Sequence, residues 1–332
     1  PGQQLLPVWR DYVVCSACGH GGYPVDDLLK LLPGGLSPGL QAVAVRLGAR
    51  LPFADAAQEL VQLFRVAVSP STVRRLTLQA GQTSVANETA EAERVHRDRP
   101  TPPHGPALQQ VSADGAMVPL VRGQWAEVKT VAIGTLTTRT EGGKKVPRAT
   151  DISYFSRLAD HDRFGRLALS EFHRRGTETA GQVVAVMDGS DWLQTLLDLH
   201  RPTAIRILDF PHAVEHLTTA AQAVFGPASK QATGWVTHQA QQLRHSDPEL
   251  VLAALRTLPC ATAADPEGAQ RVRDKTLAYF LKRRTQITYA EFQAKGYPIG
   301  SGMVESANKL VVEARLKGSG MLWEPSNVDP ML

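Results

Sequence analysis

The order of apolar segments in the central part of the chain places the strongest limit on its fold. Three strand-like segments, 108–113, 126–134 and 152–156, follow one another with no helical pattern between them. Two further apolar strands, 182–187 and 204–208, then alternate with helical patterns. Consecutive strands favour antiparallel pairing, whereas strands separated by helices favour parallel crossovers. The sequence therefore predicts an α/β fold in which helices cover the faces of a mixed sheet.

Helical patterns then fill about 213–295, and a last helix is expected at 304–316 after a glycine-rich loop. This order resembles that of a ribonuclease-H-like sheet, with the long helical stretch as an insertion. The first and fourth strands of such a sheet are neighbours. We therefore assign residues 107–332 to one ribonuclease-H-like domain, preceded by a proline-rich linker at 99–106.

The residues before the linker indicate a separate all-α region at 37–98. Two of its helices, within 54–80, are joined by a tight turn, which is the pattern of a helix-turn-helix. Gly81 is expected to end the second of them, before a further polar helix. Arg74 and Arg75, near the start of that second helix, are candidate DNA contacts. An ordinary helical packing unit is the alternative.

Residues 1–36 contain the pair Cys15-x-x-Cys18, which has the spacing of half a zinc ribbon. A closed zinc site needs four ligands, and His20 is the one further ligand type nearby. Two unligated thiols are therefore the alternative to a partial zinc-binding segment. The third cysteine, Cys260, lies in the helical insertion. Three cysteines cannot form a disulfide framework, so the sequence favours a reducing, cytoplasmic compartment.

Composition and charge exclude several classes of protein. With 43% hydrophobic and 20% charged residues, the 332-residue chain is expected to be globular and neither disordered nor collagen-like. No apolar run approaches the ~18 residues of a membrane-spanning helix, so no membrane partner is expected. The net charge of +4 permits nucleic-acid binding. The stretch 269–317 holds ten Lys or Arg residues and four Asp or Glu residues. This excess of positive charge suits a phosphate-handling site. A solvated helix face is the alternative, and charge alone favours it.

Three acidic residues directly follow predicted strands: Asp114, Asp188 and Asp209. Sites in open α/β sheets gather at the carboxyl ends of the strands, so we expect Asp114 and Asp188, on neighbouring strands, to lie side by side. Glu305, at the start of the last helix, can bring another carboxylate to the same edge. Each has a structural alternative, because Asp-Gly after a strand is a hairpin signal and Glu305 could pair with Lys309 one turn on.

Together these carboxylates predict a site for divalent cations. Mg²⁺ and Mn²⁺ take oxygen ligands, and Mg²⁺ sites combine a few carboxylates with phosphate oxygens. Two such ions roughly 4 Å apart can activate a water or a 3′-hydroxyl and stabilise the leaving oxygen of a phosphoryl displacement. The glycine motifs of nucleotide-binding loops are absent from the sequence.

Three segments of the chain resemble DDE transposases of bacterial insertion sequences. They are 111–120 (VSADGAMVPL), 125–130 (WAEVKT) and 297–309 (YPIGSGMVESANK). The chain is most similar to the ISKra-type enzymes, within the wider group of Mutator-like relatives, and the likeness extends from about residue 15 to residue 332. The third segment, with the letters EARLKGSGM after it, is the most specific.

This resemblance implies roles for particular residues. Asp114 matches the first catalytic acid and Glu305 the last, while Asp188 matches the middle acid, which ends the fourth strand in related transposases. Asp209 and His212 match a separate signature of the family, in which a Cys or Asp is followed by two residues and then a His. The match implies that Asp209 and His212 support the catalytic acids. The rival assignment puts Asp209 in the triad and leaves Asp188 as a turn residue. The implied reaction is Mg²⁺-dependent cleavage of DNA at the ends of the insertion sequence, followed by strand transfer.

DNA is therefore the expected partner, as terminal inverted repeats and as target, and the resemblance implies a homo-oligomer that pairs two ends. Further candidate DNA contacts are Lys144 and Lys145, in a predicted hairpin, and Lys309. A bacterial, nucleoid-associated location and a zinc-binding N-terminus are also implied. The chain begins without Met and stops where a further helical stretch is expected, which suggests a truncated copy. A catalytically inactive DNA-binding remnant is the alternative function.

Overall fold

The computed structural model describes residues 9–29, 36–141 and 144–332, and the chain divides into two compact units. The first unit contains residues 1–87, 119–123 and 314–332. The second contains residues 88–118 and 124–313. This division differs from a boundary at the expected linker, because the last residues of the chain pack with the N-terminal helices.

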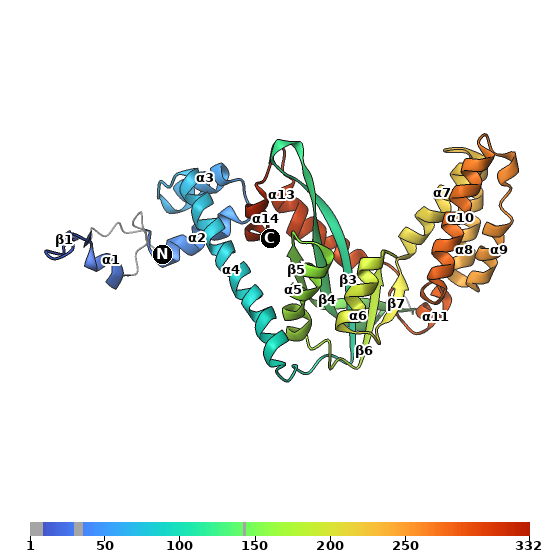
Figure 1. Ribbon diagram of the computed structural model, residues 1–332, viewed down its shortest axis with the longest axis horizontal. Helices are drawn as coiled ribbons and strands as arrows, with labels where there is room; N and C mark the ends of the chain where they lie inside the picture. Colours follow the sequence, from blue (N-terminus) through green and yellow to red (C-terminus); the bar gives the residue numbers. More distant parts are fainter. Residues whose placement is uncertain (1–8, 30–35, 142–143) are drawn as a thin grey trace. The chain divides into compact units, whose positions relative to one another are not determined.

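The second unit is built on a five-stranded mixed sheet with the order β5-β4-β3-β6-β7 (Figure 1). Its strands are β3 (Leu108–Pro119), β4 (Trp125–Glu141), β5 (Lys144–Arg157), β6 (Gln182–Met187) and β7 (Ile205–Leu208). The pair β4–β5 is antiparallel, whereas β3–β6 and β6–β7 are parallel. The predicted mixed α/β class is therefore confirmed, and the first and fourth strands are neighbours as expected.

Alternation of apolar residues along β6 explains why helices cover both faces of this sheet. On one face Val183, Ala185 and Met187 pack with buried residues of α5 (His161–Arg174) and α6 (Asp191–His200). On the other face Val184 and Val186 pack with residues of the helical insertion. The strand is thus buried on both sides, which fixes its position in the sheet.

The insertion forms the predicted run of helices, and several of them lie side by side in Figure 1. They are α7 (Phe210–Phe225), α8 (Lys230–His245), α9 (Pro248–Arg256), α10 (Pro266–Lys282) and α11 (Tyr289–Ala294). Asp209, Ser229, Asp247 and Asp265 cap the first four, since each side chain accepts a backbone N–H of its helix. In the part of the chain that the structure describes, no helix has both the length and the apolar character to cross a membrane.

Two strand predictions are wrong in their bounds. The first strand was expected to end at Asp114, but β3 continues through Asp114 and Gly115 to Pro119, so this Asp-Gly pair makes no turn. The second and third strands, expected at 126–134 and 152–156, extend to Glu141 and start at Lys144, with Glu141 opposite Lys144 and Thr137 opposite Arg148. Backbone pairing across this hairpin satisfies the N–H and C=O groups of polar residues that carry no apolar strand signal.

The first unit packs α2 (Pro38–Gly48), α3 (Phe53–Phe64) and the start of α4 (Pro70–Asp98) around Ala44, Leu60, Val73 and Leu76. The other short elements of this unit are β1 (Val13–Val14), β2 (Gly21–Gly22), α1 (Pro24–Leu28), α13 (Ala314–Leu316) and α14 (Pro325–Met331). The Trp323 ring lies edge-on to Phe53, with 6.4 Å between ring centroids. This contact helps to hold the end of the chain on the N-terminal helices.

The expectation that Gly81 ends a helix is wrong. The helix α4 runs without interruption from Pro70 to Asp98, so the predicted helices on either side of Gly81 are one. A Cβ atom on Gly81 would lie 1.8 Å from the carbonyl oxygen of Pro330. The glycine is therefore explained by a close backbone approach from α14 and not by a helix end.

Alanine at Gly81 is expected to destabilise the protein by about 1–3 kcal/mol, because the added methyl group overlaps a backbone carbonyl. Helix propensity alone predicts the opposite sign, a gain of about 1 kcal/mol. Gly234→Ala is the matched control, since Gly234 lies in α8 with no heavy atom near its Cβ position. Urea denaturation of both variants checks this, and equal stabilisation by both would contradict it.

Candidate functional site

The parallel pairing of β3, β6 and β7 brings Asp114, Asp188 and Asp209 into one row, with Asp114 inside β3 and the other two just after β6 and β7. The register of β3 and β6 puts Asp114 and Asp188 at equivalent positions, since the residues three places before them are paired. The register of β6 and β7 does the same for Asp188 and Asp209, because the residues immediately before them are paired. Asp188 thus lies between the other two along one edge of the sheet.

Asp114 is partly buried and held from both sides. Its Oδ1 accepts the backbone N–H of Gly115 at 2.7 Å, and its Oδ2 accepts the side-chain amide of Asn308 at 3.1 Å. Burial raises the pKa of Asp114, and the negative charges of Asp188 and Glu127 raise it further, while the two hydrogen bonds oppose the rise. Asp114 and Asp188 are therefore close enough for their negative charges to repel each other.

Glu127 and Lys129 of β4 lie beside Asp114. A Cβ atom on Gly115 would lie 2.1 Å from Glu127 Oε1, so the glycine leaves room for this carboxylate. Lys129 Nζ donates to Glu127 Oε2 at 2.6 Å and to the carbonyl of Ala159 at 3.2 Å, and its side chain is buried. This buried ammonium group orients Glu127 and offsets part of the negative charge at the edge of the sheet.

The helix after the glycine-rich loop reaches the same edge through Ser301, Glu305 and Asn308. The helix α12 (Gly302–Ala307) continues as a π-helix over Asn308–Glu313, and Met303, Val304 and Ala307 pack against Ala132 of the sheet. The backbone N–H of Ser301 donates to Asp209 at 2.7 Å, and Asn308 donates to Asp114.

Glu305 lies between these two contacts along the helix. Residues at intervals of four and three share one face of a helix, so Ser301, Glu305 and Asn308 form one stripe. Glu305 is exposed, and its Oε1 accepts the Ser301 hydroxyl at 3.4 Å rather than pairing with Lys309 one turn on. The stripe spans the row of aspartates from Asp209 to Asp114, with Glu305 in its middle.

The loop after Asp188 packs closely against α10 of the insertion. Asp188 Oδ1 accepts the backbone N–H of Ser190 at 2.7 Å, and the N–H of Gly189 donates to the hydroxyl of Tyr279 at 3.1 Å. A Cβ atom on Gly189 would lie 2.3 Å from that hydroxyl oxygen. Burial raises the pKa of Tyr279 to about 12. Tyr279 therefore stays protonated and supports the loop that presents Asp188.

Asp209 has a different environment from Asp188. It is buried, and its two carboxylate oxygens accept separate backbone N–H groups, from Ser301 at 2.7 Å and from His212 at 3.0 Å. It thereby caps α7 and fixes the loop before α12. The His212 side chain lies 3.4 Å from Glu215 and edge-on to His216, with 5.3 Å between ring centroids.

The donor set at the row suits Mg²⁺ or Mn²⁺. Asp114 and Asp188 supply two carboxylates, and Mg²⁺ is commonly bound by one or two carboxylates together with water and substrate phosphates. The buried Oδ1 of Asn308 has no hydrogen-bond partner, so the site also offers an oxygen acceptor with an unmet requirement. Among residues 9–29, 36–141 and 144–332, no three His, Cys, Asp or Glu side chains form a group that could hold an ion.

The candidate DNA contacts lie on several elements. Arg74 and Arg75 are exposed in the first turns of α4, and Lys309 is exposed beside Asn308. Lys144 and Lys145 lie in β5, in the hairpin with β4, and their side chains are outside the described part of the structure.

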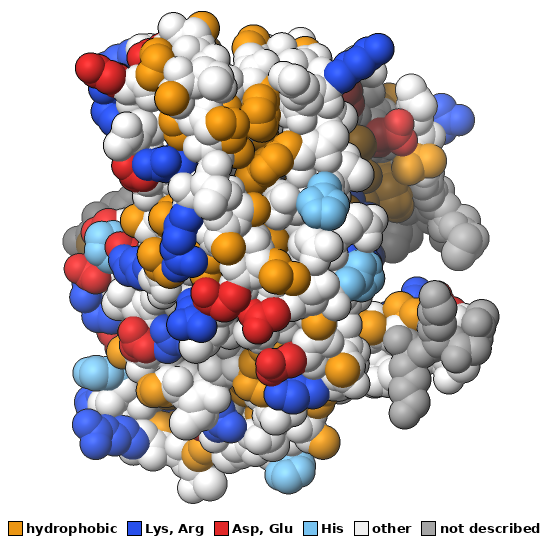
Figure 2. Space-filling model, turned by 90° about the vertical axis from the view of Figure 1, so that its right-hand side faces the viewer, with side chains coloured by type: hydrophobic (Ala, Val, Ile, Leu, Met, Phe, Trp, Pro, Cys, Tyr) orange, Lys and Arg blue, Asp and Glu red, His pale blue; other side chains and the backbone are white. Residues whose placement is uncertain are grey.

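Half of the Lys and Arg side chains in the stretch 269–317 form ion pairs. Five of its ten Lys or Arg side chains pair with carboxylates: Arg271, Arg273, Lys282, Arg283 and Arg284. Figure 2 shows a face on which Lys and Arg side chains lie next to Asp and Glu side chains. The exposed side chains of Arg271, Lys282 and Arg284 fit the solvated-face interpretation, whereas Arg283 is buried and pairs with Asp191, shortly after Asp188.

The Cys15–Cys18 pair lies in the small hairpin of β1 and β2. The backbone N–H of Cys15 donates to the carbonyl of His20 at 2.7 Å, and both thiols are exposed. Hydrogen bonds from the backbone of Cys18 and Ala17 lower the pKa of the Cys15 thiol, which favours the thiolate form that binds metal. The described residues supply half of the four ligands that a structural zinc site requires. The rest of the expected N-terminal segment, 1–8 and 30–35, lies outside the described residues.

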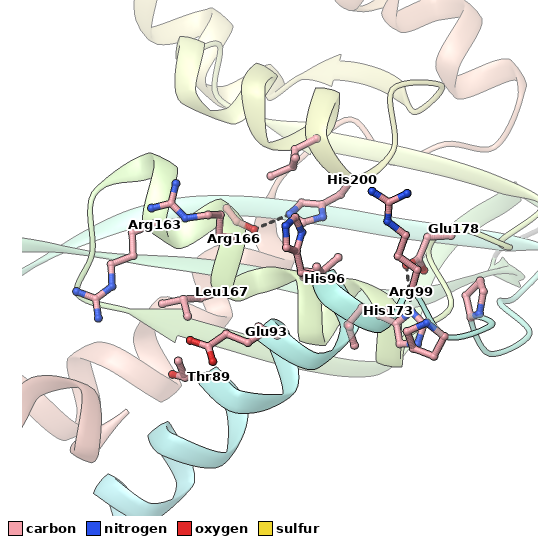
Figure 3. Close-up of a pocket in the computed structure, with 17 residues that line it drawn as sticks. Thr89, Glu93, His96, Arg99, Arg163, Arg166, Leu167, His173, Glu178 and His200 are labelled. Atoms are coloured by element: carbon pink, nitrogen blue, oxygen red, sulfur yellow. Dashed lines mark hydrogen bonds and ion pairs between the residues drawn. The ribbon is translucent and has the colours of Figure 1, made fainter.

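A separate cavity of about 830 Å³ lies between the end of α4, α5 and α6 and contains none of the predicted site residues (Figure 3). His200, in its lining, stacks on Phe172 with 4.1 Å between centroids, and its Nε2 lies 2.8 Å from the carbonyl of Gly165. Burial lowers the pKa of His200 to about 4, so it is neutral near pH 7. These contacts give His200 a structural role in the packing of α6 on α5.

Sequence reasoning missed four residues around the row of aspartates: Glu127, Lys129, Tyr279 and Asn308. Glu127, Lys129 and Asn308 stand inside the segments that resemble transposases, at 125–130 and 297–309, so the signal was present but unassigned. Tyr279 lies in an ordinary helical pattern that gives no such signal.

Comparison with models of known protein families finds none that matches this chain, and no curated protein matches it. The functional argument therefore depends on the residues of the site.

Proposed function

We propose that the protein is a metal-dependent DNA transposase, with Asp114, Asp188 and Glu305 as its catalytic acids. One observation carries the proposal: aspartates of neighbouring strands share one row, and the helix of Glu305 spans that row through Ser301 and Asn308. The strand order, with one antiparallel and two parallel pairs, supports a ribonuclease-H-like sheet. The three segments that resemble insertion-sequence transposases support the DNA substrate.

The environments of the two rival acids favour Asp188 as the middle acid. Both oxygens of Asp209 are occupied by backbone N–H groups, and the residue is buried. Asp188 is less buried, has one oxygen bonded to Ser190, and lies close enough to Asp114 to raise its pKa. Asp209 and His212 then support the site by fixing α7 and the loop before α12.

The residues of the chain would act mainly by binding and orienting. Bound Mg²⁺ or Mn²⁺ would activate the attacking hydroxyl and stabilise the leaving oxygen. Asp114 and Asp188 would hold the cations, with Glu305 presented from the helix above the row. Asn308, Gly115 and the Tyr279-supported loop would hold the two aspartates in place before DNA binds.

Several Lys and Arg side chains are candidate DNA contacts. Lys309 lies next to Asn308 and can reach a phosphate near the catalytic edge. Arg74 and Arg75 are proposed contacts of the helix-turn-helix pair α3 and α4, and Lys144 and Lys145 of the hairpin. Phosphate contacts of this kind position DNA without reading its sequence.

Cleavage of supercoiled plasmid DNA that contains the sequences flanking the coding region tests the proposal. With Mg²⁺ or Mn²⁺ the intact chain is expected to produce nicked or linear DNA with 3′-hydroxyl ends, and EDTA is expected to abolish the reaction. A labelled-nucleotide extension assay detects the 3′-hydroxyl ends. DNA binding without cleavage under all these conditions would instead identify a catalytically inactive remnant.

A further inference from the structure

The side chain of Asn308 joins the helical segment that begins with α12 to Asp114. It is 6% exposed, and its amide nitrogen lies 3.1 Å from Asp114 Oδ2. A carboxylate can only accept, so the nitrogen of the amide, and not its oxygen, must face Asp114. The contact joins residues 194 positions apart in sequence, which makes it a feature of the folded site and not of local structure.

The other polar atom of the same amide differs from the nitrogen. Asn308 Oδ1 is buried and accepts no hydrogen bond from the residues that the structure describes. A buried unsatisfied acceptor is costly to stability and calls for an explanation beyond packing. An apolar side chain of the same size would fill this position without that cost.

The backbone at Asn308 is also unusual. The regular helix α12 ends at Ala307, and a π-helix begins at Asn308. π-helical turns are rare and occur frequently at functional sites. The altered turn starts at the residue that contacts Asp114, while the apolar residues just before it pack on the sheet.

From these observations we infer that Asn308 is a positioning residue for Asp114. Through its amide nitrogen, Asn308 orients the Asp114 carboxylate toward a divalent cation. Its amide oxygen accepts a hydrogen bond from the hydrated ion. The inference rests on the proposed function. It assigns Asn308 no contact with the reacting phosphate. A residue that orients a ligand typically changes metal affinity by about 10- to 100-fold when it is removed.

The test measures Mn²⁺ binding to the full chain without DNA, by the electron paramagnetic resonance signal of free Mn²⁺. Asn308→Leu keeps the branched shape of the side chain and replaces both polar amide atoms with methyl groups. We expect its Mn²⁺ affinity to fall about 10- to 100-fold, with a melting temperature equal to or above that of the wild type. We expect the same fall in Mn²⁺ affinity for Asn308→Ala, which replaces the leucine variant in the test if that variant does not fold.

Ser306→Ala is the matched control, because Ser306 is exposed on the same helix and its hydroxyl bonds only to the carbonyl of Gly302. Its Mn²⁺ affinity should equal that of the wild type. If Asp114→Asn loses Mn²⁺ binding but both Asn308 variants bind like the wild type, the inference is wrong and the proposed function stands. If the wild type binds no Mn²⁺, or Asp114→Asn binds it equally well, the proposed function fails and the inference with it.

Discussion

Asparagine in place of Asp114 is expected to reduce metal-dependent DNA cleavage by roughly 10³-fold or more, since catalytic groups of this kind contribute on that order. The substitution removes the carboxylate charge but keeps the shape and an oxygen acceptor for Asn308. DNA binding should be retained, because the change removes a negative charge from a surface that would receive phosphates. Plasmid cleavage and an electrophoretic mobility shift with the same DNA measure the two properties.

Glu267→Gln is the matched control, since Glu267 is an exposed acid in the first turn of α10, at the opposite end of that helix from Tyr279. It should cleave DNA like the wild type. Cleavage by Asp114→Asn at a rate similar to that of this control would remove Asp114 from the catalytic residues.

The Asp114→Asn variant is also expected to be at least as stable as the wild type. Because burial raises the pKa of Asp114 in the folded state, the unfolded chain releases this proton at a lower pH than the folded protein does. The wild type therefore loses stability as pH rises through the window between the unfolded and folded pKa values. Asp114→Asn should lack that loss, and denaturation across this range of pH measures the difference.

Alanine in place of Asp209 is expected to destabilise the protein by about 2–4 kcal/mol, as the sum of a lost helix cap and an unsatisfied buried N–H group. Both oxygens of Asp209 accept backbone N–H groups, from His212 at the start of α7 and from Ser301 before α12. Asp188→Ala should change stability by less than about 1 kcal/mol, because it removes one loop hydrogen bond and a charge that repels Asp114. Urea denaturation compares the two.

This comparison separates the rival assignments of the middle acid. Under the assignment proposed here, Asp188→Asn abolishes cleavage in a stable protein, whereas Asp209→Ala loses activity together with stability. A stable Asp209 variant without cleavage, beside an active Asp188 variant, would reverse the two roles.

Local patterns in the sequence were sufficient to predict the order of elements. Continuous apolar runs marked β6 and β7, helical patterns marked the insertion, and Asp188 and Asp209 directly follow the two marked strands. These signals depend on residues within a few positions of each other, so they are readable without the fold. The predicted bounds were wrong for strands whose ends are decided by backbone pairing and not by a pattern of side chains. The hairpin of β4 and β5 is an example.

The sequence by itself therefore determined the α/β class, the order of elements and the presence of Asp188 and Asp209 at the carboxyl ends of β6 and β7. Only the tertiary structure decided what each acid contacts. Ser301 and Asp209 are 92 positions apart, and Asn308 and Asp114 are 194 positions apart, yet these bonds distinguish a structural aspartate from a candidate metal ligand. Gly81 shows the same limit, because the reason for a glycine there lies in the carbonyl of Pro330. Hydrogen bonds and close contacts between distant residues depend on how elements pack, and no local periodicity records that packing.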